Sequence, residues 1–320
     1  MSLFKIENLV YYYPEREKPA LQEINLAIEE GEVILVAGES GSGKSSLGRT
    51  LAGLLPDFYG GRFGGRVYFQ ERDIRKMDRR RLARKVGMIF QDPEKQLVMT
   101  SVEAEIAFGL ENLGLPPQEM LRRVAEVTGF LGLTGLSDKF TVSLSGGEKQ
   151  KLALAAVLAM QPQVLICDEP TSQLDPVAAE DFLNLIKRLN EEMGLTVVLI
   201  EQRLERCFHL ADRVLLMENG RIVQDGSPEQ IARRARKNGL PFLPPVARFF
   251  SLLGNAFVPV TVMSALALDG VQGSAHPLPV RMAACAACLA VALWSRSLFL
   301  TVLAGVAICS FAGPILEILR

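Results

Sequence analysis

The chain has 320 residues, of which 49% are apolar and 22% are charged, with 35 basic and 36 acidic side chains and a net charge of -1. This composition excludes a disordered or collagen-like chain and suffices for two domains with a sizeable core. Because the net charge is close to zero, any binding of nucleic acid would require a local basic patch. The first residues include Lys5 and Glu7 and lack the apolar core of a secretory signal, so we expect a cytoplasmic location.

The first predicted functional element is a phosphate-binding loop. An apolar run at 33–37 predicts a buried parallel strand, and residues 46–55 predict a helix. Between them stands the pattern G-x-x-x-x-G-K-S, in the strand–loop–helix context that this motif requires. We expect backbone N–H groups to surround phosphate oxygens, Lys44 to reach the β and γ phosphates, and Ser45 to ligate Mg²⁺. The predicted nucleotide-binding residues of this loop are Gly38, Glu39, Ser40, Gly41, Ser42, Gly43, Lys44, Ser45 and Ser46.

A second apolar run, at 164–167, ends in two adjacent carboxylates, Asp168 and Glu169. Ligands of parallel sheets bind at the carboxyl ends of the strands, so we expect this pair to face the same phosphates. Side chains alternate along a strand, which lets one carboxylate hold the Mg²⁺ shell while the other orients and deprotonates the attacking water. Together with the phosphate loop, the pair predicts a hydrolytic site.

Residues 144–150 read Leu-Ser-Gly-Gly-Glu-Lys-Gln and open a helical pattern. Ser145, Gly146 and Gly147 at a helix start form a second anion-binding nest. A nucleotide or small-molecule kinase shares the phosphate loop but does not need this nest. The motif LSGGE, found in this order with the other two motifs, resembles the signature of the ATP-binding-cassette (ABC) ATPases over roughly residues 3–235.

The resemblance implies an α/β fold with a P-loop NTPase core of the ABC ATPase type and a helical subdomain inserted at about 92–145. We expect this ATPase domain to span 1–238, followed by a C-terminal extension at 239–270 and an apolar, mostly helical tail at 271–320. In this family two cassettes face each other head to tail, and each signature helix completes the partner's phosphate site. The resemblance therefore implies a second ABC ATPase subunit, either a copy of this chain or a paralogue.

The resemblance also assigns roles to single residues. Tyr13 matches the aromatic residue that stacks on adenine, although Tyr11 and Tyr12 are adjacent competitors. Gln91 matches the glutamine that contacts the metal and the water and reports to the membrane subunit, and Asp175 matches the loop that crosses to the partner cassette. The implied catalytic residues are Glu169, Gln202 and Gln91, and the implied Mg²⁺ ligands are Ser45, Gln91 and Asp168. The implied ATP-binding set adds Tyr13, Ser145, Gly146, Gly147 and Asp175 to the phosphate loop.

One position departs from the family pattern. After an apolar strand at 196–200 the family places a histidine that contacts the γ phosphate, and here Gln202 occupies that place. A glutamine donates a hydrogen bond to a phosphate oxygen but does not become an imidazolium near neutral pH. We hypothesise that this chain's own site hydrolyses ATP slowly while its signature serves the partner's site. The alternative is a tolerated variation in a fully active enzyme.

Longer stretches indicate the subfamily. Residues 90–97, 101–113, 170–176 and 201–205 are similar to the cobalt-type and energy-coupling-factor (ECF) ATPases. The resemblance implies import of a vitamin or transition-metal ion at the cytoplasmic face of the membrane. It also implies two membrane partners, a transmembrane coupling subunit and a substrate-binding subunit, and no nucleic acid. The alternative is a soluble ABC-type ATPase acting on nucleic acid or ribosomes, for which we expect a long coiled-coil insertion or two cassettes in one chain.

Two charge features complete the pattern. Eight basic residues at 72–85 alternate with acidic ones and lack aromatic neighbours, which favours a solvated helix face near anionic lipid headgroups over a nucleic-acid site. Residues 249–320 carry only five charged side chains. Within them, 282–294 and 297–316 are similar to the last hairpin of small branched-chain amino acid permease subunits, and the second is long enough to span a membrane. Two interpretations of these stretches stay open: a membrane hairpin that anchors the chain, and a buried element that packs on the protein or forms a dimer contact.

Overall fold

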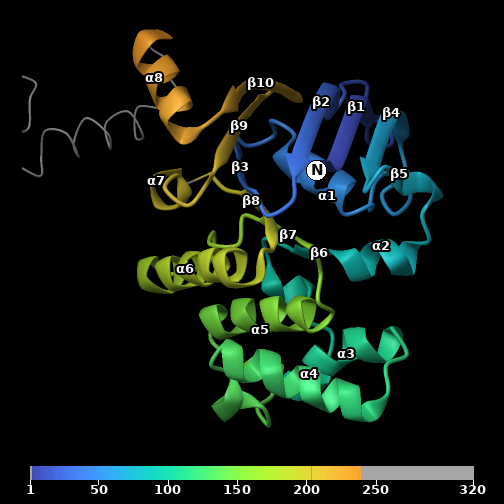
Figure 1. The fold of residues 1–320 in the computed structure, drawn as a ribbon, viewed down its shortest axis with the longest axis vertical. Coiled ribbons are helices and arrows are strands. Elements are labelled where there is room, and N and C mark those ends of the chain that lie inside the picture. Colours follow the sequence, from blue (N-terminus) through green and yellow to red (C-terminus); the bar gives the residue numbers. More distant parts are fainter. Residues whose placement is uncertain (1, 203, 239–320) are drawn as a thin grey trace, which may run out of the picture. The chain divides into compact units, whose positions relative to one another are not determined.

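The computed structural model describes residues 2–202 and 204–238, and the chain divides into two compact units, 1–233 and 234–320. The first unit contains two sheets and the helices around them (Figure 1). The expected extension at 239–270 and tail at 271–320, with the membrane hairpin, lie outside the described residues. No helix within the described ranges combines the length and the apolar character that a membrane span requires.

The larger sheet has six strands in the order β10-β9-β3-β8-β7-β6. Neighbouring strands are parallel except for β10, which pairs antiparallel with β9 at one edge. Every residue of β7 and β8 is buried, because helices and loops cover both faces of this sheet. The strands are β3 (Val33–Gly38), β6 (Val86–Ile89), β7 (Val164–Asp168), β8 (Thr196–Ile200), β9 (Arg213–Glu218) and β10 (Arg221–Gly226). The apolar runs at 33–37, 164–167 and 196–200 are therefore strands of one sheet.

The smaller sheet is antiparallel and has four strands in the order β2-β1-β4-β5. These strands are β1 (Ser2–Tyr12), β2 (Leu21–Glu29), β4 (Arg62–Phe69) and β5 (Arg72–Asp73). Helix α1 (Lys44–Leu51) shares one apolar core with both sheets. Gly48 permits this packing, because a Cβ at that position would lie 2.8 Å from Cδ1 of Ile200 on β8. The helix that follows the phosphate loop is thus held against the large sheet.

The end of α1 differs from the predicted helix at 46–55. The observed helix stops at Leu51, and Gly53 takes a left-handed φ of 71°. The N–H of Leu54 donates to the carbonyl of Arg49 at 2.9 Å, and the N–H of Gly53 donates to that of Thr50 at 3.0 Å. This pair of bonds is a Schellman cap, which a glycine makes possible, so Gly53 is the stop signal that the prediction overlooked.

Helices α3 (Val102–Asn112) and α4 (Pro117–Phe130) occupy the interval in which we expected an inserted helical subdomain, and both pack on α5 (Gly146–Ala159). Figure 1 shows these three helices together, away from the small sheet. The other helices are α2 (Arg79–Lys85), α6 (Pro176–Met193), α7 (Leu204–Cys207) and α8 (Pro228–Asn238). Short 3₁₀ helices are η1 (Ile74–Lys76), η2 (Pro93–Lys95), η3 (Thr134–Leu136) and η4 (Thr141–Ser143).

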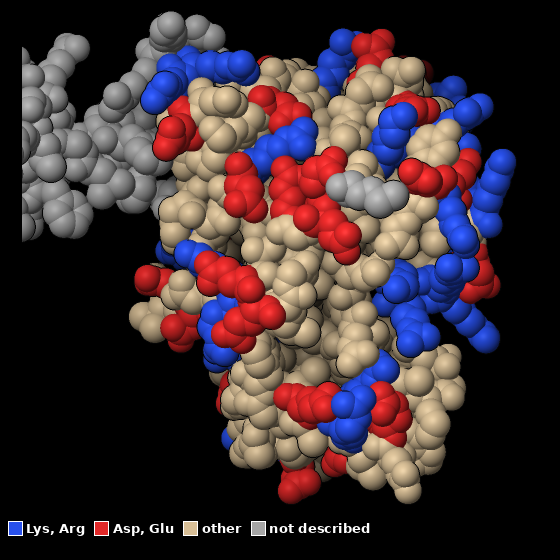
Figure 2. Space-filling view, in the orientation of Figure 1, with Lys and Arg blue, Asp and Glu red and all other residues tan. Residues whose placement is uncertain are grey.

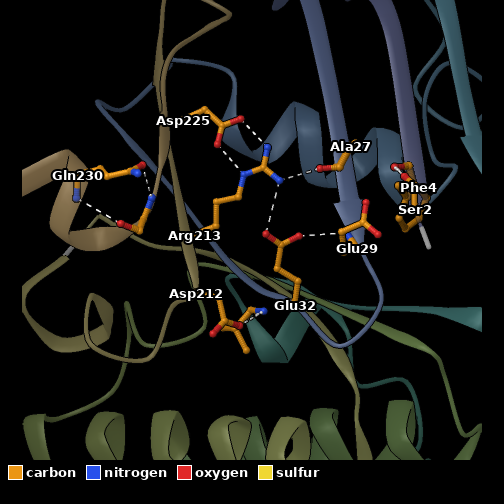
Figure 3. A network of polar contacts seen from close by, with 11 residues as sticks. Ser2, Phe4, Ala27, Glu29, Glu32, Asp212, Arg213, Asp225 and Gln230 are labelled. Atoms are coloured by element: carbon orange, nitrogen blue, oxygen red, sulfur yellow. Dashed lines mark hydrogen bonds and ion pairs between the residues drawn. The ribbon is translucent and has the colours of Figure 1, made fainter.

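A polar network joins the two sheets at the start of β9 (Figure 3). Arg213 donates from Nε and Nη2 to the carboxylate of Asp225, both at 2.5 Å. Its Nη1 donates to the carbonyl of Ala27 at 2.9 Å and pairs with Glu32 at 3.5 Å. Glu32 in turn accepts from the N–H of Glu29 at 3.0 Å. The hairpin of β9 and β10 is thereby fixed to the turn between β2 and β3, the strand that leads into the phosphate loop.

Candidate functional site

The loop between β3 and α1 has a backbone that requires glycine at two positions. Gly38 and Gly43 have positive φ angles of 149° and 104°. A Cβ would lie 2.2 Å from the carbonyl oxygen of Met217 at the first and 2.5 Å from that of Ala20 at the second. Ser42 belongs to the same loop, and its hydroxyl is buried and has no hydrogen-bond partner. A tight cradle with an orphaned donor is what a bound phosphate group would complete.

Lys44 begins α1 and is almost fully buried, at 4% exposure. Its Nζ donates to the carbonyls of Gly38 and Glu39 at 3.0 and 2.7 Å. Burial lowers the pKa of this ammonium, and the carboxylates of Glu169 and Asp168 act in the opposite direction. The lysine ammonium is therefore held by carbonyl groups of the loop itself, which an incoming phosphate can replace as its partners.

The phosphate loop and the carboxylate pair, which are far apart in the sequence, meet at Ser45, the residue after Lys44. Ser45 and Asp168 are 123 positions apart. The Ser45 hydroxyl donates to Oδ1 of Asp168 at 2.8 Å. Burial raises the pKa of Asp168, although the hydrogen bond from Ser45 partly opposes this. A cation would offset the cost of a buried carboxylate here. The described residues contain no group of three His, Cys, Asp or Glu side chains that could hold a metal. A hydroxyl, a carboxylate and an amide suit instead a hard cation such as Mg²⁺, which keeps waters and phosphate oxygens as ligands.

Glu169 lies between two glutamine side chains. Its Oε2 accepts from Nε2 of Gln91, after β6, at 3.2 Å, and its Oε1 accepts from Nε2 of Gln202, after β8, at 2.6 Å. The three residues that the sequence assigned to catalysis are therefore in direct contact, as expected for the ends of neighbouring parallel strands. Glu169 also has a φ of 48°, in the left-handed region that non-glycine residues rarely adopt.

Of the three adjacent tyrosines, Tyr13 lines the cleft. Its hydroxyl shares a hydrogen bond with Ser46 at 3.1 Å and accepts one from Nη1 of Arg49 at 2.9 Å. The Arg49 guanidinium lies 4.9 Å from the ring centre of Tyr59. Tyr11 is fully buried and donates to the carbonyl of Gly60 at 2.7 Å, so it is a core residue.

Most of the predicted site residues of the phosphate loop and of the strand ends line one open cleft of about 910 Å³, but Gly38, Glu39, Ser42 and Asp168 do not. It is lined by Tyr13, Pro14, Arg16, Lys18, Pro19, Ala20, Gln22, Ser40, Gly41, Gly43, Lys44, Ser45, Ser46, Arg49, Gln91, Glu169, Gln202, Asn219 and Gly220. The sequence interpretation missed the basic residues Arg16, Lys18 and Arg49. Arg49 had a usable signal, because it follows Ser45 by four positions and therefore lies on the same face of the helix.

The residues of the LSGGE motif lie elsewhere. Ser145 caps α5, where its Oγ accepts from the N–H of Glu148 at 3.3 Å and Oε2 of Glu148 accepts from the N–H of Ser145 at 2.7 Å. Asp175 caps α6 by accepting from the N–H groups of Val177 and Ala178, both at 3.0 Å. Neither Ser145 nor Asp175 lines the cleft. The two helix starts adjoin, because a Cβ on Gly147 would lie 3.5 Å from that of Ala178.

The basic cluster predicted at 72–85 spans more than one element. Only Arg79–Lys85 form a helix, α2, while the preceding basic residues lie on β5 and η1. Figure 2 shows Lys and Arg side chains gathered over β4, β5 and α2. The interleaved acids have local roles, since Asp73 and Asp78 cap η1 and α2. The helix is amphipathic, with Leu82 buried and its basic side chains largely exposed.

Comparison with known proteins gives two family matches. Residues 21–172 match the family described as ABC transporter. Residues 241–312 match the family described as branched-chain amino acid transport protein (AzlD). The second match includes most of the apolar stretches for which the sequence indicated such a resemblance. It also includes most of the expected extension at 239–270, whose assignment stays a prediction.

Curated relatives carry the description putative ABC transporter ATP-binding protein. One from Methanosarcina mazei is 46% identical over 233 residues, which are 73% of this chain and 40% of the relative. One from Pyrococcus abyssi is 40% identical over 231 residues, which are 72% of this chain and 82% of the relative. One from Bacillus cereus is 46% identical over 82% of this chain and 47% of the relative. The chain thus spans less than half the length of the first and third of these relatives.

Solved structures have the same fold. The structure of cbiO1 from Clostridium perfringens, described as part of the ABC transporter complex cbiONQ, has a TM-score of 0.65 and 31% identity, and covers 78% of this chain and 99% of its own. The ATP-binding cassette MJ0796, a dimer bound to ADP and phosphate in a post-hydrolysis state, has a TM-score of 0.61 and 26% identity, and covers 70% of this chain and 98% of its own.

Proposed function

The chain belongs to the family of ABC transporter ATP-binding proteins, and on that premise we propose that it binds and hydrolyses ATP to energise an importer of the ECF or cobalt type. The observation that carries the proposal is the contact of Glu169 with Gln91 and Gln202 beside the Ser45–Asp168 hydrogen bond. This arrangement brings a general base, metal ligands and a phosphate cradle into one cleft.

Each group has a defined task in the proposed reaction. The N–H groups of the phosphate loop and Lys44 hold the β and γ phosphates, and Lys44 exchanges its present carbonyl partners for phosphate oxygens. Ser45, Asp168 and Gln91 would hold Mg²⁺, which neutralises phosphate charge when bound. Glu169 orients the attacking water and accepts its proton, and Tyr13 stacks on adenine.

The contact between Gln202 and Glu169 bears on the rate. The Gln202 amide donates to the carboxylate that is proposed to accept a proton from water, so it occupies one acceptor position of Oε1 and competes with a water molecule there. A glutamine stays a neutral donor at every pH, whereas a histidine at this position would gain or lose a proton near neutrality. The contact supports the hypothesis that this chain's own site is the slower one of a pair.

A second cassette is part of the proposal. Ser145, Gly146, Gly147 and Asp175 do not line this chain's cleft, so they are available to complete the cleft of a facing subunit. The proposed partner is a copy of this chain or a paralogue, and the departure at Gln202 favours a paralogue. The dimeric state described for MJ0796 supports the general arrangement.

The proposed cargo is a vitamin or a transition-metal ion, moved by a transmembrane coupling subunit and a substrate-binding membrane subunit. Support comes from the subfamily stretches and from the likeness to cbiO1, described as part of the cbiONQ transporter complex. The match of 241–312 to AzlD favours a second candidate cargo, a branched-chain amino acid. We further propose that the chain works at the cytoplasmic face of the membrane and that this segment anchors it there. The names of the relatives do not favour the alternative, a soluble ATPase on nucleic acid or ribosomes.

The test is to purify the full chain from membranes in a mild detergent, identify the proteins and small molecules that accompany it, and measure ATPase activity. Lys44→Ala should remove ATP binding and hydrolysis. Glu169→Gln should retain ATP binding and lower kcat by about 100-fold or more. Glu180→Gln, an exposed glutamate on α6, is the matched control and should behave like the wild type.

Recovery of the chain without membrane partners would contradict the importer. Wild-type activity no higher than that of Lys44→Ala would contradict the ATPase itself. A retained metal or vitamin would favour the first cargo, and a retained branched-chain amino acid the second.

A further inference from the structure

Glu201 is a buried carboxylate that the proposed reaction does not use. It follows the last residue of β8 directly, and it is only 3% exposed. Burial of a charged side chain is costly unless it is hydrogen-bonded. Oε1 of Glu201 accepts from both donors of Thr171, the N–H at 3.1 Å and the hydroxyl at 2.6 Å. Thr171 is itself 2% exposed, so the contact is shielded from water.

The turn that Glu201 contacts is the one that begins at Glu169. The N–H of Ser172 donates to the carbonyl of Glu169 at 3.1 Å and closes the turn, and the N–H of Glu169 donates to the carbonyl of Ile200 at 2.9 Å. The backbone of the turn is therefore tied to the end of β8 twice, through the carbonyl of Ile200 and through the contact of Thr171 with Glu201, in addition to the contact of the Glu169 side chain with Gln202. Both ties lie at the strand end that also carries Gln202.

Glu169 needs such support because of its backbone conformation. Its φ of 48° costs about 1–2 kcal/mol for an L-residue with a side chain. Such a conformation persists only where the surrounding structure determines it more than once. Without the Glu201–Thr171 contact, one of the two ties is lost, and the turn can relax toward an ordinary conformation that moves the carboxylate.

We propose that Glu201 is a positioning residue that acts through Thr171 to hold Glu169 in place for attack by water. The inference rests on the proposed role of Glu169 as the general base. Displacement of a reacting group by about 1 Å costs up to about 100-fold in rate. Glu201 does not line the cleft, so its loss should lower kcat and leave ATP binding intact.

The experiment uses the full chain and separates kcat from the Kd for ATP. Glu201→Leu keeps the volume and removes the acceptor, and kcat should fall at least about tenfold with the Kd for ATP changed less than twofold. Glu201→Gln keeps a carbonyl oxygen that can accept both Thr171 donors, and it should retain most of kcat. Thr171→Val should reproduce a partial loss, and Thr171→Ser, which keeps the hydroxyl, should restore it.

Glu105 is the matched control. It is a second buried carboxylate, 4% exposed, that accepts from the N–H groups of Val98 at 2.9 Å and Met99 at 2.6 Å, and it does not line the cleft. Glu105→Leu should lower stability but leave kcat near the wild-type value. Equal kcat losses in Glu105→Leu and Glu201→Leu, or parallel changes in kcat and Kd, would overturn the proposal.

If Glu201→Leu does not fold, the pair Thr171→Val and Thr171→Ser decides, and equal kcat values for the two would overturn the proposal. The proposed function fails separately, when the wild type hydrolyses ATP no faster than Lys44→Ala.

Discussion

Two amide groups hold the carboxylate of Glu169, and the one from Gln202 is the shorter contact, at 2.6 Å against 3.2 Å for Gln91. The residue at position 202 is therefore the closer of two neighbours that compete with a water molecule for the proposed base, Glu169. A glutamine side chain has no titrating proton, so the residue at position 202 adds no pH dependence of its own. Substitution at position 202 should therefore change the ATPase rate without removing the proposed base, Glu169.

Gln202→His should raise the ATPase rate severalfold, because an imidazole can contact the γ phosphate and leave Glu169 free. The gain should vary with pH around the ordinary histidine pKa of about 6.5. Steady-state ATPase rates between pH 6 and 8.5 measure both effects. Gln202→Leu, which has no hydrogen-bond donor, is the control. An unchanged or lower rate for Gln202→His would refute the idea of a weakened site.

Glu119, on α4, has a pKa well below that of an ordinary glutamate. Hydrogen bonds from Arg122 at 2.7 Å and Arg123 at 2.8 Å lower its pKa from the ordinary 4.5 to about 2. The folded state therefore holds this carboxylate ionised more strongly than the unfolded state does. Its contribution to stability is fully present above about pH 4.5 and is lost as the pH falls toward 2.

A carboxyl-carbon NMR titration of the chain should place the Glu119 midpoint well below 4.5. Arg122→Gln and Arg123→Gln should each move the midpoint back toward that value. A midpoint that stays where it is in both variants would show that the two arginines do not cause the shift.

Arg213 fixes the hairpin of β9 and β10, so its replacement should lower the stability of the fold. Arg213→Met leaves Asp225, Glu32 and the carbonyl of Ala27 without this partner, which should lower the free energy of unfolding by about 2 kcal/mol. The melting temperature should fall by about 4–8 °C. Lys187→Met is the control, because its pair with Glu191 at 3.6 Å is solvent-exposed and contributes little. Calorimetry that gives equal losses for both variants would contradict the assigned role.

The elements differ in how well the sequence predicts them. The strands at 33–37, 164–167 and 196–200 are continuous apolar runs that end in polar residues, and this pattern correctly indicates parallel strands whose ends meet. The contacts of Ser45 with Asp168 and of Glu169 with Gln91 follow from that topology. The pairing of Thr171 with Glu201 does not, because a hydrogen bond between residues 30 positions apart leaves no local pattern.

At the scale of the whole molecule, the LSGGE residues Ser145, Gly146 and Gly147 do not line the cleft of their own chain. Gly146→Arg should be tolerated by the fold, since the nearest atom to a Cβ there, the carbonyl oxygen of Gln173, is 4.0 Å away. The same substitution should prevent a second cassette from closing on this surface. Gly129→Arg, on α4, is the matched control, because nothing lies within 4 Å of its Cβ position.

In the Glu169→Gln background, ATP and Mg²⁺ should drive association with a second copy or with a copurified paralogue, measured by light scattering in detergent. Gly146→Arg should abolish this association, and Gly129→Arg should preserve it. Absence of ATP-dependent association with either partner would refute the proposed pairing. Association of the Gly146→Arg variant would place the interface elsewhere.

The left-handed backbone of Glu169 has an evolutionary consequence. Glycine and asparagine adopt this conformation with less strain than glutamate, and neither adds a charge beside Asp168 and Glu201. A mutation to one of these residues should therefore relieve backbone strain, which offsets the loss of the hydrogen bonds from Gln91 and Gln202, and should leave a subunit that still folds. On this argument the preservation of this carboxylate would depend on selection for the proposed ATPase activity rather than on selection for folding. In a paired assembly, where one active site can suffice, decay at this position would be the expected first step toward a cassette that binds nucleotide without consuming it.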